Sequence, residues 1–178
     1  MGHAMEFPQA LKTPRLLLTR LDPGDFEDFL GTSGAHDAQA LHTDEAAMRF
    51  RAHVEHWQRH GFGWWAVRDP QTRRFVGCGG LESATIDGRR STMVSCDAWD
   101  RAYAGELVRI AVAQGFVGLD VQEILAAPSA SDAVSRVLER AGFTRAEGPQ
   151  AAYRLTAQAW CASTGPRGRA ASRAFQAA

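Results

Sequence analysis

The stretch WDRAYAGELVRIAVAQGF, residues 99–116, begins with a run of small residues and passes without a break into an apolar helical pattern. The helix predicted over residues 104–119 is apolar on most of its sides, so we expect it to lie deep in the core. Small residues at the start of a helix let backbone N–H groups converge on one point, where the helix adds about half a positive charge. Taken alone, the stretch is therefore either an ordinary helix start or a phosphate-binding loop.

The segments on either side of this helix predict a mixed α+β fold. Before it, the sequence predicts a strand at TPRLLLTRL, helices over residues 23–31 and 44–61, and three antiparallel strands at GWWAVRDP, RRFVGCGGLESATIDG and STMVSC. After it come a strand at VQEILAAP, a helix at SDAVSRVLERAGF, a last strand at AAYRLTAQAW and a tail with three arginines. A strand, a helix and a strand in that order imply a parallel pair. We therefore expect a central, mostly antiparallel sheet with one parallel strand pair.

Composition and charge limit the classes of protein to which the chain can belong. At 178 residues it is most simply one domain, which we place at residues 13–162, between an N-terminal segment (1–12) and a flexible C-terminal tail (163–178). Lys plus Arg and Asp plus Glu both total 20, so no net field attracts nucleic acid or an anionic membrane. No apolar run is long enough for a membrane span. The three widely spaced cysteines fit neither a disulfide framework nor a zinc ribbon, which predicts a cytoplasmic protein without a metal site.

Five segments, in this order and spacing, resemble one enzyme family. They are TPRLLLTRL, GFGWWAV followed by FVGCGGL, WDRAYAGEL, SDAVSRVLERAGF and YRLTAQAW, and together they resemble the GNAT superfamily of acyl-CoA N-acetyltransferases. The closest resemblance is to the RimJ/RimL-like branch, which includes ribosomal-protein N-terminal acetyltransferases. It runs from about residue 13 to residue 160.

The resemblance implies a reaction and a cosubstrate. Acetyl-CoA would donate its acetyl group to a primary amine, on a protein N-terminus or a small molecule, by direct attack on the thioester. The strands STMVSC and VQEILAAP would splay apart to admit the pantetheine arm, and a backbone N–H of the first would polarise the thioester carbonyl. The protein would be a monomer or a homodimer, without nucleic-acid or membrane partners.

The first motif is the cofactor loop, which in this family commonly reads Trp-Gly-Lys/Arg-Gly-Tyr-Ala-Thr-Glu-Ala. The resemblance implies that CoA is bound by Trp99, Arg101, Ala102, Tyr103, Ala104 and Gly105. Asp100 and Ala102 stand where the pattern has glycines, so side chains replace bare backbone and the Asp100 charge opposes the phosphates. Arg101 can offset that charge because a guanidinium binds phosphate bidentately.

The second motif is SDAVSRVLERAGF, which resembles the family pattern Asn-x-x-Ser-x-Arg-Val-Leu-Glu-Lys-x-Gly-Phe. It places Ser131 and Val134 at the two polar positions and Arg136 at the arginine position, and the family helix flanks the pantetheine arm. Val134 can offer only apolar contact. Ser135 falls one residue late, about 100° around the helix, and is either a cofactor contact or an ordinary helix serine.

The acceptor amine has to lose a proton, and its pKa sets how much help it needs. At pH 7 a lysine amine with a pKa near 10.4 costs about 4.6 kcal/mol to deprotonate, whereas an α-amine near 7.8 costs about 1.1 kcal/mol. Relatives often carry a glutamate on the strand before the cofactor loop, but STMVSCDA has none. We identify Glu82 and Asp97 as candidate bases, with His42 as a further candidate. The alternative for both carboxylates is that they are solvated surface acids.

Three histidines of the second predicted helix fall on one side of it. His53, His56 and His60 are spaced by three and four residues, which is a spacing that can present imidazoles to a metal. No acid or cysteine shares their face of the helix, and they lie off its apolar stripe. We therefore expect a solvated face rather than a metal site.

Tryptophans and glycines cluster around the predicted strands. Trp57, Trp64 and Trp65 either pack in the core or line an acceptor pocket. The glycines of FVGCGGL sit inside a strand pattern, so they indicate a bulge or a close approach of backbones rather than a nucleotide loop.

The resemblance as a whole predicts an acetyl-CoA-dependent N-acetyltransferase. The changed loop glycines, the valine at a polar helix position and the missing glutamate leave a second hypothesis open, a catalytically weak or silent CoA-binding sensor or scaffold. A small-molecule binding module without CoA would require five ordered matches to be accidental.

Overall fold

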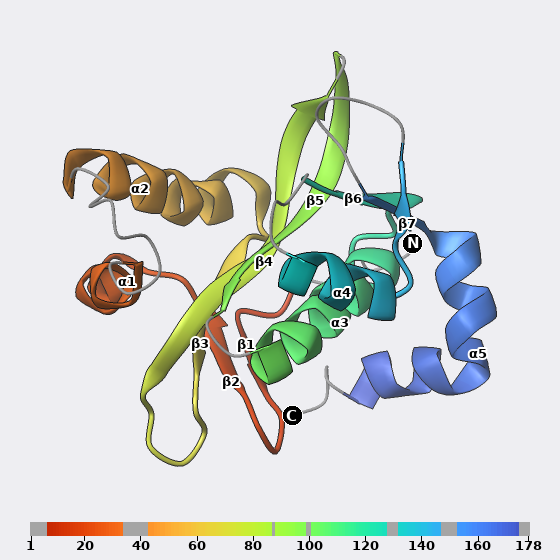
Figure 1. Ribbon diagram of the computed structural model, residues 1–178, viewed down its shortest axis with the longest axis horizontal. Helices are drawn as coiled ribbons and strands as arrows, with labels where there is room; N and C mark the ends of the chain where they lie inside the picture. The colour runs from red at the N-terminus through yellow and green to blue at the C-terminus, as the bar shows by residue number, and fades with distance from the viewer. Residues whose placement is uncertain are drawn as a thin grey trace.

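The computed structural model describes residues 7–33, 43–86, 88–98, 101–127, 132–146 and 153–174 (Figure 1). Its strands form one eight-stranded sheet in the order β1-β2-β3-β4-β5-β6-β8-β7. The strand bounds are β1 Ala10–Lys12, β2 Leu17–Arg20, β3 Trp64–Arg68, β4 Phe75–Ile86, β5 Arg89–Ala98, β6 Glu123–Ala126, β7 Thr144–Arg145 and β8 Tyr153–Thr156. Every neighbouring pair in this sheet is antiparallel except β5 with β6, which is parallel. The predicted mixed α+β class is confirmed.

Helices cover both faces of the sheet. They are α1 Phe26–Ser33, preceded by the 3-10 turn Pro23–Asp25, then α2 Thr43–His60, α3 Arg101–Val117, α4 Asp132–Arg140 and α5 Ala157–Ala174. Helices α1 and α2 lie together at one end of the view in Figure 1, while α4 and α5 both pack on α3. The two groups bury two main clusters of apolar side chains, one on each face of the central strands, except that Trp57 of α2 belongs to the cluster of α3.

The alternation of side chains along β4 and β5 assigns residues to the two faces. Leu81 and Val94 pack in the cluster that contains α3, whereas Cys78 packs with residues of α1 and α2. Because successive side chains of a strand point to opposite faces, Glu82 lies on the α2 face of the sheet. The α3 cluster is the larger one, which agrees with the prediction that this helix lies deep in the core.

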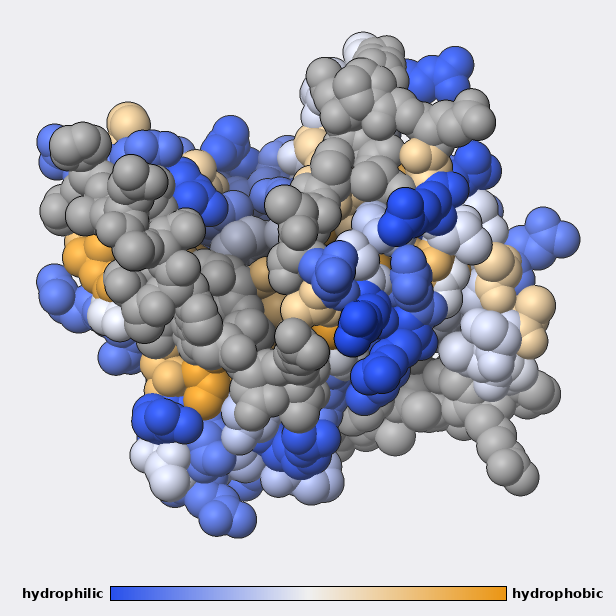
Figure 2. Space-filling view, viewed as in Figure 1, coloured by the Kyte–Doolittle hydropathy of each residue, from blue (hydrophilic) through white to orange (hydrophobic). Residues whose placement is uncertain are grey.

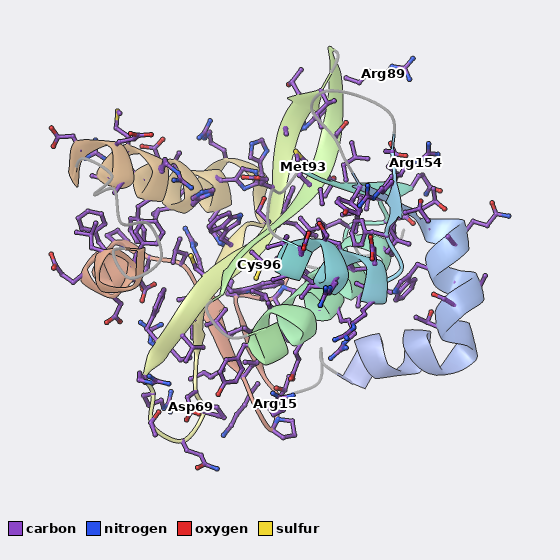
Figure 3. The ribbon with its side chains drawn as sticks, in the orientation of Figure 1. Arg15, Asp69, Arg89, Met93, Cys96 and Arg154 are labelled. Atoms are coloured by element: carbon purple, nitrogen blue, oxygen red, sulfur yellow. The ribbon has the colours of Figure 1, made fainter. Side chains whose placement is uncertain are left out.

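The parallel pair is short and opens at one end. Its register pairs Met93 with Leu125, and β6 then pairs with β8 along its whole length. Beyond Met93, β5 continues to Ala98 beside β4. In Figure 3, Met93 and Cys96 mark these two parts of β5. The strands STMVSC and VQEILAAP therefore meet at one position and diverge from there, as the sequence predicted.

The C-terminal region differs from the prediction. The last strand, β8, ends at Thr156, and residues 157–160, which were expected to continue it, begin α5; that part of the prediction is wrong. The Thr156 hydroxyl accepts the N–H of Ala159 at 3.2 Å, a helix N-cap, and Trp160 packs on Phe116 with ring centroids 5.4 Å apart. Helix α5 runs to Ala174 with a break at Gly165, where φ is 58°. The short strands β1 and β7 were not predicted.

Across the described residues, no helix is long and apolar enough to cross a bilayer. Among the coloured residues of the face seen in Figure 2, hydrophilic ones predominate, with small separate apolar patches between them. Met48 and Val134 are the large apolar side chains exposed among the described residues.

Candidate active site

The junction between β5 and α3 contains the predicted cofactor loop. Strand β5 ends at Ala98 and α3 begins at Arg101, so a strand leads through a two-residue connection into a helix N-terminus. Such a terminus presents unpaired N–H groups and a positive dipole end to an anion. Tyr103, Ala104 and Gly105 are half-buried in the first turns of α3. A Cβ added at Gly105 would have open space around it, so the helix surface there is free for a ligand.

Several predicted loop residues lie outside the described part of the structure. Trp99 and Asp100 are among them, and the side chains of Arg101 and Ala102 are too. The predicted contacts of these residues with CoA therefore stay predictions.

Glu106, at the glutamate position of the loop motif, contacts the β1–β2 turn. Its Oε1 accepts a hydrogen bond from the Thr13 hydroxyl at 2.6 Å, and the Arg15 guanidinium lies 3.9 Å from Oε2. Thr13 is buried, and its hydroxyl also accepts the N–H of Leu16 at 2.9 Å. This contact ties the β1–β2 turn to the start of α3.

Helix α4 supplies the second predicted cofactor surface. Ser131 lies outside the described residues, Val134 is 39% exposed and Arg136 is exposed, while Ser135 is half-buried. The helix is held by Leu138 in the core and ends in a Schellman motif, in which Phe143 N–H donates to the Leu138 carbonyl at 3.0 Å. Val134 and Arg136 are thus both accessible to solvent, although they point about 200° apart around α4.

Glu82 is fixed at the opening of the parallel pair. The Ser95 hydroxyl donates a hydrogen bond of 2.9 Å to Glu82 Oε1. Ser95 lies two residues beyond Met93, the last position at which β5 pairs with β6. The Glu82 side chain is 27% exposed, and Ser95 contacts only one of its two oxygens. One of the two predicted bases therefore stands where the strands diverge.

His53 reaches the same place from helix α2. Its Nδ1 lies 3.8 Å from Glu82 Oε2, and its ring stacks on Trp64 with centroids 3.7 Å apart and an interplanar angle of 15°. Burial, together with the positive charge of Arg49 and the nearby His56, lowers the pKa of His53 to about 4. The imidazole is therefore neutral near neutral pH.

The expectation of a solvated histidine face is wrong for His53 and His56. His56 is 8% exposed, accepts the Ser83 N–H at its Nε2 (2.8 Å) and donates from Nδ1 to the Phe62 carbonyl (2.8 Å). It links the edge of β4 to the chain that enters β3. His60 lies further out, 2.8 Å from the Arg90 guanidinium. Burial lowers the pKa values of His56 and His60.

Within the part of the chain that the structure describes, no metal site joins this cluster, and the strand register keeps Asp97 apart from Glu82. Within the described residues, no group of three or more His, Cys, Asp or Glu is arranged to hold a metal ion. Asp97 pairs with Cys78 in the β4–β5 register, whereas Glu82 pairs with Met93, so the two candidate bases are separated by four residues, roughly 13 Å along the strand. The Asp97 side chain and His42 lie outside the described part.

The glycines of β4 allow close backbone contact under the cluster. A Cβ at Gly80 would collide with the Gly63 carbonyl and lie 2.9 Å from Trp64 Cα. A Cβ at Gly79 would lie 2.6 Å from the Ser95 carbonyl. The predicted close approach of backbones is confirmed, and it sets β3, β4 and β5 around the candidate site.

Of the three tryptophans, two pack in the core and one faces the candidate site. Trp57 and Trp65 are buried in the core cluster of α3, with Phe7 between them. Trp64 is also buried but faces the candidate site through its stack with His53. Its indole N–H is buried and has no hydrogen-bond partner among the described residues.

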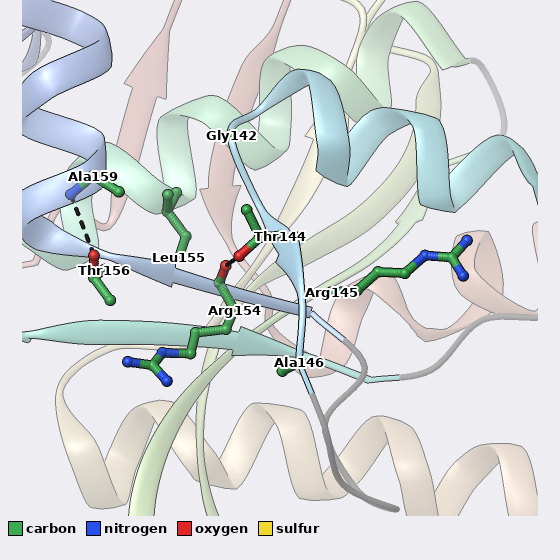
Figure 4. A pocket seen from close by; sticks show the side chains of 8 residues that line it. All are labelled: Gly142, Thr144, Arg145, Ala146, Arg154, Leu155, Thr156 and Ala159. Atoms are coloured by element: carbon green, nitrogen blue, oxygen red, sulfur yellow. Dashed lines mark hydrogen bonds between the residues drawn. The ribbon is translucent and has the colours of Figure 1, made fainter.

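A separate pocket of about 500 Å³ opens at the other end of the sheet (Figure 4). It is lined by β7, β8 and the first turn of α5, with β6 and β5 between it and β4. Figure 4 shows Arg145 and Arg154 pointing away from each other, and Arg154 pairs with Glu123 at 2.8 Å. The pocket therefore gathers no set of catalytic groups.

The candidate site therefore consists of a short parallel strand pair, a helix N-terminus that can receive an anion, and a carboxylate beside the pair. Residues 15–144 match the Acetyltransferase (GNAT) domain family. The match covers most of the chain, so the chain belongs to this family and is an N-acetyltransferase by family.

Solved structures of acetyltransferases have the same fold. A putative GnaT-family acetyltransferase from Bordetella pertussis is 22% identical, with a TM-score of 0.68 over 83% of this chain and 98% of that one. A ribosomal-protein-S5-alanine acetyltransferase from Vibrio fischeri is 13% identical, with a TM-score of 0.65 over 85% and 98%. A spermidine N-acetyltransferase from Vibrio cholerae, in complex with CoA and spermine, is 14% identical, with a TM-score of 0.61 over 83% and 99%. At these identities the likeness establishes the fold.

Proposed function

We propose that this protein transfers the acetyl group of acetyl-CoA to a primary amine by direct attack on the thioester, with Glu82 as the general base. The observation that carries the proposal is the position of Glu82. Ser95 fixes its Oε1 two residues beyond the β5–β6 pair at Met93, and the side chain as a whole is 27% exposed. A carboxylate that is held by one oxygen and partly exposed is suited to accept a proton.

The proton and electron changes follow from this arrangement. Glu82 accepts one proton from the incoming ammonium, and the freed lone pair forms the N–C bond to the acetyl carbon. The C–S bond then breaks, and the sulfur leaves as a thiolate that takes up the proton lost by the new amide nitrogen. Backbone N–H groups of β5 beyond Met93 would stabilise the oxyanion of the intermediate.

The CoA part of the substrate is assigned to α3 and α4. The start of α3 would hold the pyrophosphate through its N–H groups, with Tyr103, Ala104 and Gly105 around it, and the open space at Gly105 supports this placement. Arg101 and the exposed Arg136 would contribute charge, and Val134 apolar contact. Replacing Asp100 and Ala102 with glycine together should tighten CoA binding measured by calorimetry. Weaker binding would argue against this account of the loop.

The acceptor is assigned to the α2 face, where Glu82 lies. We place the protein in the RimJ/RimL-like branch, on the order of its sequence motifs, and solved relatives of similar fold carry ribosomal-protein and spermidine acetyltransferase names. A thiol-release screen distinguishes the acceptors. It compares a pentapeptide with a free α-amine, spermidine, a free amino acid and an aminoglycoside.

Glu82→Gln tests the base directly. We expect kcat to fall by about a hundredfold or more, because general base catalysis contributes about that much. The loss should be larger with spermidine than with the α-amine peptide, whose amine is more acidic. Glu55→Gln, an exposed glutamate of α2 that pairs with Arg59, is the matched control. An unchanged kcat in Glu82→Gln would refute the assignment.

Ligand-dependent stability tests the cosubstrate separately from turnover. At a hundred times its Kd, acetyl-CoA should add about 2.7 kcal/mol to the free energy of unfolding. No thermal shift at millimolar acetyl-CoA would contradict the proposed function. A shift without turnover on any amine would instead indicate a CoA-binding sensor.

A further inference from the structure

We propose that His53 binds the acceptor amine, with its Nδ1 accepting one N–H of the ammonium while Glu82 Oε2 accepts another. The inference rests on the proposed function, since it assigns a second residue to the same site. It makes His53 a binding and positioning residue that orients the nitrogen, and it leaves the proton transfer to Glu82.

The separation of the two atoms is the first observation behind this proposal. Nδ1 of His53 and Oε2 of Glu82 are 3.8 Å apart, which is longer than a hydrogen bond, so they do not bind each other. A nitrogen atom placed between them can lie about 2.9 Å from both. Ser95 already occupies Oε1, which leaves Oε2 as the oxygen that faces this gap. Both side chains keep partial exposure, 16% for His53 and 27% for Glu82.

The histidine ring is held in place by its stack on Trp64. The ring planes differ by 15°, and Trp64 is buried, so the imidazole has a fixed plane and a fixed edge toward β4. The backbone of Trp64 is itself held, because its carbonyl accepts the Trp57 indole N–H at 2.6 Å. A rigid acceptor loses little side-chain entropy when a ligand binds.

Burial and the charged groups around the His53 ring keep it neutral, so that its Nδ1 can accept a hydrogen bond. Helix α2 contributes Arg49 and His56, β4 contributes Glu82, and the Trp64 ring from β3 is uncharged. Burial together with Arg49 and His56 holds the pKa of His53 at about 4, so near pH 7 the ring carries no charge that would repel an ammonium. Its unprotonated nitrogen then offers a lone pair to the substrate.

The arrangement specifies a class of acceptor. An amine needs at least two N–H groups on its protonated nitrogen to use both acceptors, so primary and secondary amines fit and tertiary amines do not. Alcohols have a single O–H and also fail to satisfy both atoms.

The tautomer of His53 provides a test that needs no turnover. The proposal requires Nδ1 to be unprotonated and Nε2 to carry the hydrogen, which long-range ¹H–¹⁵N correlation spectra of the imidazole report at about pH 7. The His53 signals are assigned by their loss in His53→Asn. A hydrogen on Nδ1, or a charged ring, would overturn the proposal.

Kinetics of three His53 variants supply the second test, using the fastest of the four screened amines. His53→Phe keeps the ring on Trp64 and removes the acceptor, so the KM for the amine should rise about tenfold to a hundredfold, as for a lost hydrogen bond to a charged group. The KM for acetyl-CoA should not change. His53→Asn places an oxygen the same number of bonds from Cβ as Nδ1 and should recover most of the loss, whereas His53→Gln places it one bond further and should recover less.

A matched control and the remaining outcomes make the test decisive. His60→Phe alters a histidine of the same helix that contacts Arg90, and its amine KM should stay at the wild-type value. An unchanged amine KM in His53→Phe would overturn the inference, and a normal effect of Glu82→Gln would leave the proposed function standing. If His53→Phe does not fold, the two other variants test the inference: the amine KM should be lower in His53→Asn than in His53→Gln, and the reverse order would overturn it. Failure of the wild type to acetylate any of the four amines would count against the proposed function instead.

Discussion

Between about pH 7 and about pH 5, the free energy of unfolding should fall by about 2 kcal/mol less in His53→Phe than in the wild type. In the unfolded chain His53 takes up a proton with its ordinary pKa of 6.5, whereas in the folded protein it does so only at about 4. Between these two values the unfolded state binds more protons than the folded state. Stability attributable to His53 is therefore intact above the upper value and declines as the pH falls toward the lower one.

The magnitude follows from the difference of the two pKa values. One unit corresponds to about 1.4 kcal/mol, so the complete loss below the folded pKa is about 3 kcal/mol, and about 2 kcal/mol of it is reached by pH 5. His53→Phe abolishes this titration while it keeps a ring on Trp64. The variant should thus be less sensitive to acid than the wild type.

Urea unfolding followed by tryptophan fluorescence at the two pH values measures the effect, with constant m-values as the check on two-state behaviour. Carboxylates that titrate near pH 5 contribute equally to both proteins and cancel in the difference. His60→Phe is the control, because the pKa of His60 is lowered less than that of His53. Equal acid-induced losses in the wild type and His53→Phe would show that His53 is not held neutral by burial.

Three further substitutions test the frame of the site by urea unfolding. Gly80→Ala should cost about 3 kcal/mol, because the new methyl group meets the Gly63 backbone, which cannot rotate away; a loss below about 1 kcal/mol would mean that the strands can separate there. Gly142→Ala should cost about 1 kcal/mol, since φ is 95° at this helix end, and no loss would contradict the left-handed conformation. Thr13→Val should cost about 2 kcal/mol by leaving buried partners unsatisfied; a neutral result would indicate that Glu106 finds another donor.

The elements that local pattern controls were predicted well. Helix α3 followed from an unbroken apolar run, and β3, β4 and β5 followed from β-rich segments separated by polar turns. The C-terminal error has a local cause that the sequence also contains. Residues 157–162 are rich in alanine and follow Thr156, so helix propensity and an N-cap compete there with continuation of the strand.

The candidate site was predicted in part. Glu82 was identified as one of two candidate bases, but neither Ser95 nor His53 was placed beside it. His53 carried a signal that could have been used, because it lies three residues after Phe50 and four before Trp57, which are both on the apolar stripe of α2. Its neighbour Glu82 is 29 residues away in the chain, and no periodicity relates the two.

The sequence by itself determined the family, the mixed sheet and the strand on which Glu82 lies, because motif order and side-chain periodicity are local properties of the chain. Only the tertiary structure decided which groups meet Glu82. The β4–β5 register brings Ser95 to one oxygen, and the docking of α2 on β3 brings a neutral His53 near the other. Both depend on packing between distant segments and on the burial that this packing produces, which lowers the pKa of His53 far below that of a solvated histidine.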